Sequence, residues 1–198
     1  MEIQSFFINL DSRKDRKEKT LEEFAQLGLS PPTRFVGAVR NSGGLGCATS
    51  HRNLMRHLAK TADGLVLVCE DDVEFRATLD EIDTTVRDFQ NRPALGVLCL
   101  AYRNRGPRLP ISPQLALANN IQTAACYIVK PSAMTALQES FEASVTSLEA
   151  GGPWSRYAND QLWKRLQNGR TYFCIPRVPL AGQRAGFSDI AMKDTFYG

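Results

Sequence analysis

The chain has 198 residues, of which 43% are hydrophobic and 23% charged, a composition typical of a globular protein with a sizeable core. Its 24 basic and 21 acidic residues leave a formal net charge of +3, a balance that gives no reason to expect a nucleic-acid partner. The length predicts one domain over residues 1–198. No apolar run is long enough to span a membrane, although a peripheral membrane contact stays open.

The five cysteines are odd in number, and none belongs to a CxxC pair. This pattern predicts reduced core thiols in a cytosolic protein. Residues 1–3 lead directly into a predicted strand, without the charged and apolar segments of a secretory leader. We therefore expect a cytoplasmic location.

The predicted strands and helices alternate along the chain. Apolar runs predict strands at residues 3–9, 33–39, 65–69, 95–101, 121–129 and 171–175. Helical periodicity and capping residues predict helices that end near Leu27, Lys60, Phe89, Phe141 and Gln167. The alternation indicates an α/β fold with helices on both faces of a sheet.

The first predicted strand leads into a basic helix. Asp11 or Ser12 is expected to cap this helix, and Gly28 to end it. The first turns carry Arg13 and Arg16 among several cations, which oppose the helix dipole. Two interpretations stay open: a solvated basic face, or guanidinium groups that meet an anionic ligand at the end of the strand.

A glycine-rich loop at residues 41–46 opens the next helix. Loop glycines allow close approach of the backbone, and a helix N-terminus attracts anions. The loop is neither a P-loop, because no Lys-Ser/Thr pair follows it, nor a GxGxxG motif. On the inward face of the helix, His51 is more commonly a hydrogen-bonded structural residue than a ligand. His57 cannot share that face, which argues against a two-histidine zinc site.

Residues 65–73 combine an apolar run with the carboxylates of Glu70, Asp71 and Asp72. The run is typical of a strand buried on both faces, whose carboxyl end faces the ligand crevice of an open α/β sheet. Adjacent carboxylates repel one another, and hard divalent cations such as Mg²⁺ and Mn²⁺ bind oxygen ligands of this kind. Taken alone, the triplet fits a solvated acidic turn better than a metal–phosphate site, so other motifs must decide.

Three later segments hold further candidates. Residues 102–120 contain several arginines and little periodicity, which predicts a flap over the crevice or a disordered excursion. Residues 144–156 predict a loop that carries Glu149. Asp160 opens the last predicted helix, either as its N-cap or as a catalytic base. The tail has little periodicity and includes Asp189.

Several short motifs together carry a resemblance to a known family. They are Phe7-Ile8-Asn9-Leu10 with Ser12-Arg13 and Arg16, Gly46-Cys47-Ala48-Thr49-Ser50-His51, Leu67 to Val73, Tyr127 with Pro131 and Ala133, Asn159-Asp160-Gln161, and Ser188-Asp189-Ile190. Together they resemble family 25 glycosyltransferases. The first segment is similar to the opening of these enzymes, residues 46–51 to their GC-x-x-SH segment, and residues 67–73 to their LEDD-V box. Tyr127 and the residues after it resemble the tyrosine strand and its helix, residues 159–161 the VD-x motif, and residues 188–190 the closing SDI. These enzymes are the lipooligosaccharide galactosyltransferases and the collagen galactosyltransferase domain. The resemblance covers about residues 3 to 190.

The resemblance implies a GT-A fold, which is a Rossmann-like nucleotide-diphospho-sugar transferase fold with a mixed, mainly parallel sheet. It implies inverting transfer of a hexose, most often galactose from UDP-galactose, assisted by Mn²⁺ or Mg²⁺. The acceptor would be a hydroxyl of a glycan of lipopolysaccharide type or of another glycoconjugate. By this resemblance Asp72, with Glu70, would bind the metal. The donor would contact Asn9, Leu10, Arg13, Arg16, Gly46, Ser50, His51, Glu70 and Asp71. Asp160 would be the catalytic base, with Glu149 and Asp189 as further candidates for the base or for acceptor binding.

Two other functions stay open. Nucleotidyltransferases also use carboxylates and a divalent ion, but they usually carry a glycine-rich loop directly after the first strand, where this chain has residues 9–13 without glycine. A non-catalytic nucleotide-sugar-binding domain would keep the fold, and the retention of all three acids and Asp160 argues weakly against it. The chain also departs from the collagen enzymes, which carry a histidine before the SD motif where it has Gln183 and Arg184.

Overall fold

The computed structural model describes residues 3–167, 172–188, 190 and 193–195. The helices are α1 (Lys14–Leu27), α2 (Gly43–Thr61), α3 (Leu79–Gln90), α4 (Pro131–Glu149), α5 (Trp154–Tyr157), α6 (Asn159–Leu162) and the 3-10 helix η1 (Trp163–Arg165). The strands are β1 (Gln4–Asn9), β2 (Thr33–Val36), β3 (Val66–Glu70), β4 (Val73–Phe75), β5 (Leu95–Cys99), β6 (Arg103–Asn104), β7 (Arg108–Pro110), β8 (Leu115–Ala118), β9 (Ile121–Gln122), β10 (Cys126–Val129), β11 (Tyr172–Pro176), β12 (Ala181–Gln183), β13 (Gly186–Ser188) and β14 (Lys193–Thr195).

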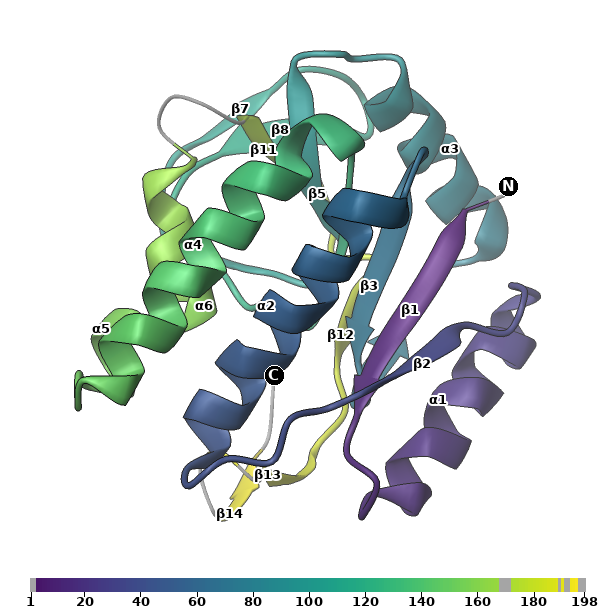
Figure 1. The fold of residues 1–198 in the computed structure, drawn as a ribbon. Coiled ribbons are helices and arrows are strands. Elements are labelled where there is room, and N and C mark those ends of the chain that lie inside the picture. Colours follow the sequence, from purple (N-terminus) through teal and green to yellow (C-terminus); the bar gives the residue numbers. More distant parts are fainter. Residues whose placement is uncertain (1–2, 168–171, 189, 191–192, 196–198) are drawn as a thin grey trace.

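An eight-stranded sheet lies at the centre of the molecule, in the order β2-β1-β3-β10-β5-β11-β8-β7 (Figure 1). β1 runs parallel to β2 and β3, and β11 runs parallel to β5. β10 is antiparallel to both of its neighbours, and β8 is antiparallel to β11 and β7. The central strands β3, β5 and β10 are buried along their whole length except at Glu70, which explains their continuous apolar sequences. Because the sheet contains both parallel and antiparallel strand pairs, it is mixed, as expected.

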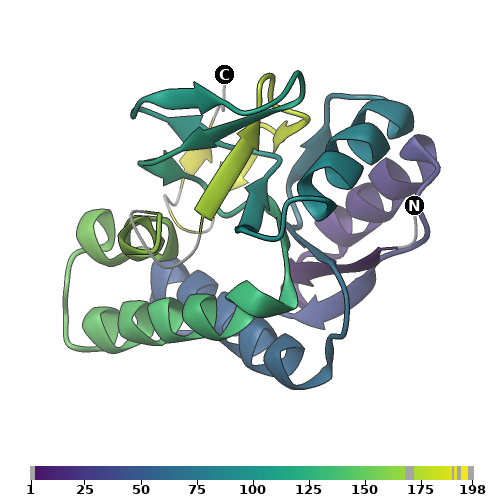
Figure 2. The ribbon, with the colours of Figure 1, turned by 90° about the horizontal axis from the view of Figure 1, so that it is seen from above.

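Helices cover both faces of this sheet. α2 and α4 pack against each other on one face, and α1 and α3 lie on the opposite face (Figures 1 and 2). The core under α2 and α4 includes Leu54, Met55 and Phe141, whereas the core on the other face includes Phe24 and Phe89. The sheet thus separates two hydrophobic half-cores, and its ends are left open for a site.

The two ends of α1 show one correct and one wrong prediction. Gly28 ends the helix in the left-handed conformation, with φ 78°, and the amide of Leu29 returns to the carbonyl of Phe24 at 2.9 Å. The N-cap is Arg13 rather than Asp11 or Ser12, and it makes no side-chain cap bond. The reason is a turn in which the amide of Arg13 donates to the carbonyl of Leu10 at 3.0 Å, so the helix begins later.

α4 is longer than its sequence pattern predicts. It begins at Pro131 as expected, but it continues past residue 141 to Glu149, through the segment predicted to be a loop. Ser144 and Val145 are buried in this extension, and the Ser144 hydroxyl donates to the carbonyl of Tyr157 at 2.5 Å. Tertiary packing against the following segment thus extends the helix beyond its recognisable amphipathic part.

The segment at residues 102–120 is not a disordered excursion, because it contains β6, β7 and β8. β8 pairs with β11, and Leu115 and Ala116 are buried there. The tail also forms strands: β12 pairs antiparallel with β4, just after the acidic triplet. These pairings join segments that are distant in the sequence, so local periodicity does not show them.

Candidate functional site

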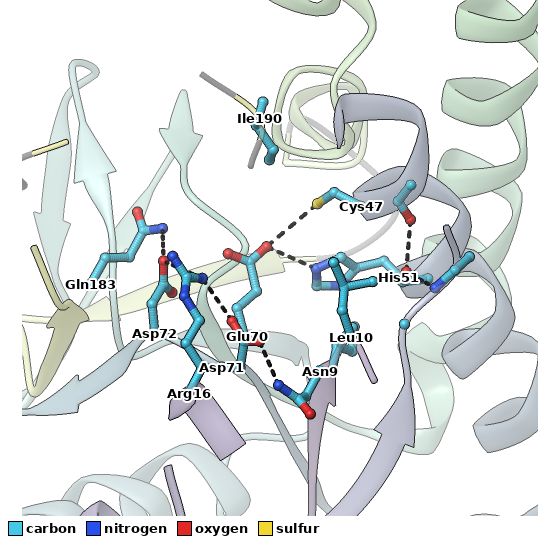
Figure 3. Close-up of a pocket in the computed structure, with 15 residues that line it drawn as sticks. Asn9, Leu10, Arg16, Cys47, His51, Glu70, Asp71, Asp72, Gln183 and Ile190 are labelled. Carbon is cyan, nitrogen blue, oxygen red and sulfur yellow. Dashed lines mark hydrogen bonds and ion pairs between the residues drawn. The ribbon is translucent and has the colours of Figure 1, made fainter. Parts of the chain in front are cut away.

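The carboxyl ends of β1 and β3 form one wall of a pocket. Their parallel register places Ile8 opposite Glu70, so the residues that end both strands lie together. The first turns of α2 and the end of β12 contribute the other walls (Figure 3). The lining residues of this acid pocket are Ile8, Asn9, Leu10, Arg16, Gly37, Ala38, Gly46, Cys47, Ser50, His51, Glu70, Asp71, Asp72, Gln183 and Ile190. Every residue expected to bind the nucleotide or the metal is therefore here, except Arg13.

The start of α2 is held tightly against the loop that precedes it. The hydroxyl of Ser50 accepts from the amide of Ala38 at 2.8 Å and donates to the carbonyl of Gly46 at 2.7 Å. A Cβ on Gly46 would lie 2.8 Å from the carbonyl oxygen of Ala38, so glycine is needed for this close approach. The start of α2 thus lies at the acid pocket, where its positive dipole end favours an anion.

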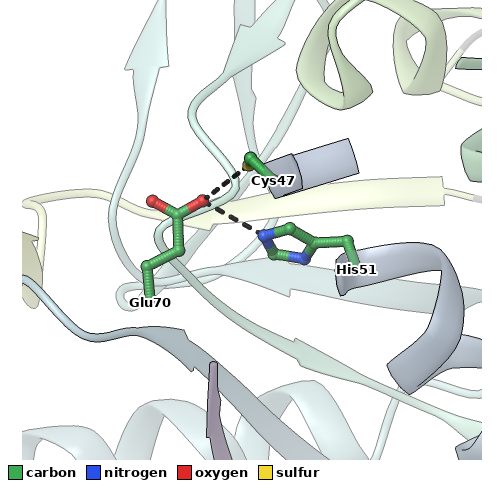
Figure 4. Close-up of side chains that lie close together, drawn as sticks. All are labelled: Cys47, His51 and Glu70. Carbon is green, nitrogen blue, oxygen red and sulfur yellow. Dashed lines mark hydrogen bonds and ion pairs between the residues drawn. The ribbon is translucent and has the colours of Figure 1, made fainter. Parts of the chain in front are cut away.

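Glu70 is held by two residues of α2. Its Oε1 lies 3.1 Å from Nε2 of His51 and accepts from the thiol of Cys47 at 3.6 Å (Figure 4). The other ring nitrogen of His51 lies 3.2 Å from the hydroxyl of Tyr127. Burial favours the neutral form of Glu70, but the imidazole of His51 and the other neighbouring donors outweigh it and lower the pKa. Glu70 is therefore a fixed, ionised carboxylate, and His51 has the structural contacts expected of it.

Cys47, His51 and Glu70 could also hold a metal ion together. One ligand atom from each lies within 4.8 Å of the others. Thiolate, imidazole and carboxylate are ligands of Zn²⁺, whereas Mn²⁺ and Mg²⁺ prefer oxygen. Burial and the charge of Glu70 raise the pKa of the Cys47 thiol well above its usual range, so in the metal-free protein the thiol is protonated and donates to Glu70.

Asp71 faces α1 and fastens it to the sheet. Its two carboxylate oxygens accept from Arg16 Nη1 and from Asn9 Nδ2, both at 2.8 Å, while Thr20 donates to its backbone carbonyl at 3.1 Å. The side chains of Arg16 and Asp71 are 16% and 11% exposed, so this ion pair is largely removed from water. Asp71 thus holds α1 against the sheet. The basic start of α1 is not only a solvated face, because Arg16 pairs with this buried acid.

Asp72 is the acid whose charge is least compensated. Its Oδ2 accepts from Gln183 at 3.4 Å and lies 3.7 Å from Nη1 of Arg16. Within the described residues, its Oδ1 is buried and has no hydrogen-bond partner. Burial, together with the negative charge of Glu70, raises the pKa of Asp72 to about 7. A buried carboxylate with one unpartnered oxygen, beside a second carboxylate, is a donor set that a hard divalent cation would stabilise.

Asp160 lies in the first turn of α6 and is not among the residues that line the acid pocket. It is not the N-cap of that helix, because the N-cap is Ala158 without a side-chain bond. Its Oδ2 instead accepts from the amide of Thr123 at 3.0 Å, where Thr123 adopts φ 82°. Burial raises the pKa of Asp160, and the negative charge of Glu70 raises it further. The hydrogen bond from the Thr123 amide lowers the pKa but does not outweigh them. Asp160 and Glu70 are therefore electrostatic neighbours.

The remaining candidates do not line the acid pocket. Arg13 pairs with the exposed Asp15 at 3.0 Å. Glu149, at the end of α4, forms an ion pair with Arg40 beside a different surface hollow. Asp189 lies outside the described residues. Arg184 is paired with Glu23 at 2.7 Å rather than facing the acids.

Sequence reasoning did not assign Cys47, Gly37 or Gln183 to the site. Cys47 had a usable signal, because it precedes His51 by one helical turn on the same face of α2. Gln183 reaches Asp72 only because β12 pairs with β4, where Gln183 stands opposite Val73. That register is a long-range feature with no local signal.

No family model matches the chain, and no curated protein matches it by sequence. Among solved structures, it is similar to a glycosyltransferase involved in glycosylation of the major capsid of PBCV-1, with TM-score 0.59, 11% identity and 96% of each chain covered. It is also similar to UDP-glucose pyrophosphorylase complexed with UDP-glucose, with TM-score 0.54, 10% identity and 90% and 91% of the two chains covered. A197 from STIV aligns over 100% of this chain and 95% of its own, with TM-score 0.51 and 13% identity.

These likenesses establish the fold. The chain has the GT-A-like, Rossmann-like architecture of nucleotide-diphospho-sugar transferases, with a mixed central sheet. In the part of the chain that the structure describes, no helix has both the length and the apolar character needed to cross a membrane.

Proposed function

We propose that the protein is a metal-dependent inverting glycosyltransferase, which moves a hexose from a UDP-sugar, with galactose the first candidate, to a hydroxyl of a glycan or glycoconjugate. The observation that carries the proposal is the unpartnered, buried oxygen of Asp72 beside Glu70. These carboxylates lie at the carboxyl end of a central strand, which is where open α/β sheets bind nucleotides. The likeness of the fold to a glycosyltransferase supports the same class.

In the proposed reaction, Asp72 and Glu70 would hold the Mn²⁺ or Mg²⁺ ion, which would supply positive charge to the diphosphate as the sugar–phosphate bond breaks. The positive dipole end of α2, which lines the pocket at Gly46, would favour the negative charge of the diphosphate, and Arg16 would add positive charge at the same edge. Asn9, Leu10, Ser50 and His51 would shape the donor pocket, because they line it.

Asp160 would act as the base that inversion requires. It would accept the proton of the acceptor hydroxyl while the acceptor oxygen bonds to the anomeric carbon and the nucleoside diphosphate leaves. Its raised pKa suits this task, and the Thr123 amide fixes the orientation of its carboxylate. We expect Asp160→Asn to keep donor binding but to lose transfer, by about 100-fold or more; wild-type turnover in this variant would exclude Asp160 as the base.

A thermal-shift screen tests the donor class. We expect Mn²⁺ with UDP, and with UDP-galactose in particular, to raise the melting temperature, because a ligand that binds only the folded state stabilises it by mass action. CDP, GDP and ADP with Mn²⁺ serve as matched controls. The absence of a shift with every UDP compound would exclude the proposed donor.

A nucleotidyltransferase is the second candidate, because the fold is also similar to that of UDP-glucose pyrophosphorylase. Incubation with UTP, Mg²⁺ and a hexose 1-phosphate separates the two. Release of pyrophosphate would assign nucleotidyl transfer, whereas a glycosyltransferase releases UDP from a UDP-sugar and none from this mixture. A protein that binds UDP but does neither would be the non-catalytic domain.

The proposed location is the cytoplasm. All five cysteines are free thiols, and four of them are buried, as expected of a protein in a reducing compartment.

A further inference from the structure

Three side chains of the acid pocket combine ligand atoms of three different kinds. They are the thiol of Cys47, the imidazole of His51 and the carboxylate of Glu70, and one ligand atom of each lies within 4.8 Å of the other two. Figure 4 shows the three groups pointing toward one another. Within the described residues, no other three histidine, cysteine or acidic side chains meet in this way. We call these three residues the mixed-ligand set.

The mixed-ligand set is built from one helix and one strand. Cys47 and His51 are four residues apart on α2, so their side chains lie one above the other on the same face. Glu70 is the last residue of β3. Because the two hydrogen bonds of Ser50 fix the start of α2 against the preceding loop, the helical ligands are already in place for an ion.

The distances within the mixed-ligand set are close to those around a tetrahedral zinc ion. Zinc bonds of about 2.0 Å to nitrogen or oxygen and about 2.3 Å to sulfur separate neighbouring ligand atoms by roughly 3.3–3.6 Å. Oε1 of Glu70 lies 3.1 Å from Nε2 of His51 and 3.6 Å from Sγ of Cys47. The third separation, between Sγ and Nε2, is at most 4.8 Å, so it must shorten by no more than about 1.3 Å.

The surroundings of the mixed-ligand set also suit a cation. Nδ1 of His51 lies 3.2 Å from the hydroxyl of Tyr127, and this contact orients the ring so that Nε2 faces Glu70. The negative charges of Glu70 and Asp160 act on the thiol of Cys47, and a divalent cation there would offset them. All three ligands line the acid pocket, so an ion can enter from the pocket and keep its fourth position open to it.

We propose that Cys47, His51 and Glu70 bind one Zn²⁺ ion in the acid pocket. Zn²⁺ takes sulfur, nitrogen and oxygen ligands together, whereas Mn²⁺ and Mg²⁺ prefer oxygen alone. The ion replaces the hydrogen bonds that hold Glu70 in the metal-free protein. Cys47 binds as the thiolate, and its proton passes to the solvent. His51 binds through the lone pair of Nε2, while Nδ1 carries the ring proton and donates it to the Tyr127 hydroxyl.

Zinc at the mixed-ligand set competes with the proposed donor site, because Glu70 belongs to both. An ion on Oε1 of Glu70 weakens the interaction of this carboxylate with Mn²⁺, and the two positive charges repel each other. Zn²⁺ therefore weakens the binding of UDP with Mn²⁺. This consequence rests on the proposed function, whereas the binding of Zn²⁺ itself does not.

Cobalt substitution tests the zinc site without any nucleotide. Co²⁺ accepts the same ligands as Zn²⁺, and its bond to a thiolate gives an intense charge-transfer band in the near ultraviolet. We expect the full chain, kept reduced, to develop this band with one equivalent of Co²⁺ and to lose it with one equivalent of Zn²⁺. Mn²⁺ in about tenfold excess should leave the band in place. The absence of a thiolate band, or its removal by Mn²⁺, would overturn the proposal.

Substitutions locate the ion. Cys47→Ser keeps a hydrogen-bond donor toward Glu70, but it should abolish the thiolate band and weaken Zn²⁺ binding by about tenfold or more. His51→Gln should weaken Zn²⁺ binding to a similar extent. The matched control is His57→Gln, which removes the other histidine, an exposed residue of α2, and it should bind both metals as the wild type does. Melting curves show that each variant is folded, and wild-type Zn²⁺ affinity in folded Cys47→Ser would contradict the assignment.

Titration of UDP in the presence of Mn²⁺, with and without one equivalent of Zn²⁺, tests the competition. We expect Zn²⁺ to weaken UDP binding about tenfold in the wild type and to have little effect in Cys47→Ser. Equal UDP affinity with and without Zn²⁺ in the wild type would contradict competition for Glu70. Failure of UDP to bind even without Zn²⁺ would count against the proposed function, and the cobalt band would still decide the zinc site.

Discussion

Three consecutive acids have three different environments in this protein. Glu70 is ionised and held by α2, Asp71 is paired with Arg16 and accepts a hydrogen bond from Asn9, and Asp72 keeps a buried oxygen without a partner. The sequence identifies the triplet but not this division, because the division depends on which neighbouring element each side chain meets. The structure therefore directs tests of the metal site to Asp72 first.

The buried, poorly compensated carboxylate of Asp72 should destabilise the metal-free protein. Its pKa rises from 3.8 to about 7 on folding, so between these pH values the folded state holds a proton that the unfolded chain has lost. Stability must then fall as pH rises through this window. We expect Asp72→Asn, measured with a chelator at pH 8, to be more stable than the wild type by up to about 4 kcal/mol.

The advantage of Asp72→Asn should shrink as the pH falls from 7 towards 3.8, because below 3.8 the wild-type carboxyl is protonated in the unfolded chain as well as in the folded protein. Melting curves at a series of pH values give the comparison. A variant that is less stable than the wild type at pH 8 would show that the Asp72 carboxylate is well compensated without a metal.

The two arginines at the start of α1 should differ sharply in importance. Arg16→Gln leaves the buried Asp71 without its ion-pair partner, and we expect a loss of about 3 kcal/mol in chemical denaturation. Arg13→Gln is the matched control, since its partner Asp15 is exposed, and it should cost less than about 1 kcal/mol. Equal losses would mean that the Arg16–Asp71 pair does not anchor α1.

At the level of elements, the sequence predicts what is encoded locally. The apolar runs predicted β3 and β5, and the periodicity predicted that His51 lies on the inward face of α2. Pairings between distant segments have no local signal, so sequence reasoning did not predict the strand β8 or the β12–β4 pair. For the same reason, sequence reasoning did not identify Gln183 as a site residue, since it reaches Asp72 only through the β12–β4 pair.

The contact between α2 and the preceding loop gives a test at this scale. A Cβ on Gly46 would meet the Ala38 carbonyl at 2.8 Å, so we expect Gly46→Ala to destabilise the protein by about 1–3 kcal/mol and to weaken nucleotide binding. Gly64→Ala is the matched control, because its Cβ would meet nothing within 4 Å. Unchanged stability and nucleotide affinity in Gly46→Ala would show that the loop can move without cost.

At the level of the whole molecule, the fold gathers the acid pocket from segments that are far apart in the sequence. The pocket lies at the ends of β1 and β3, the start of α2 forms another wall, and Gln183 of β12 reaches Asp72. Only the folded chain therefore brings these residues together.

The most direct test of the account is calorimetric titration of UDP into the protein in the presence and absence of Mn²⁺, repeated with Asp72→Asn. We predict saturable binding at one site for the wild type with Mn²⁺, and a loss of at least tenfold in affinity when the metal is removed or Asp72 is replaced. The stability of the variant in the same buffer shows that it is folded. Failure of UDP to bind, or equal affinity in all these cases, would contradict a metal-assisted nucleotide-sugar site at Asp72.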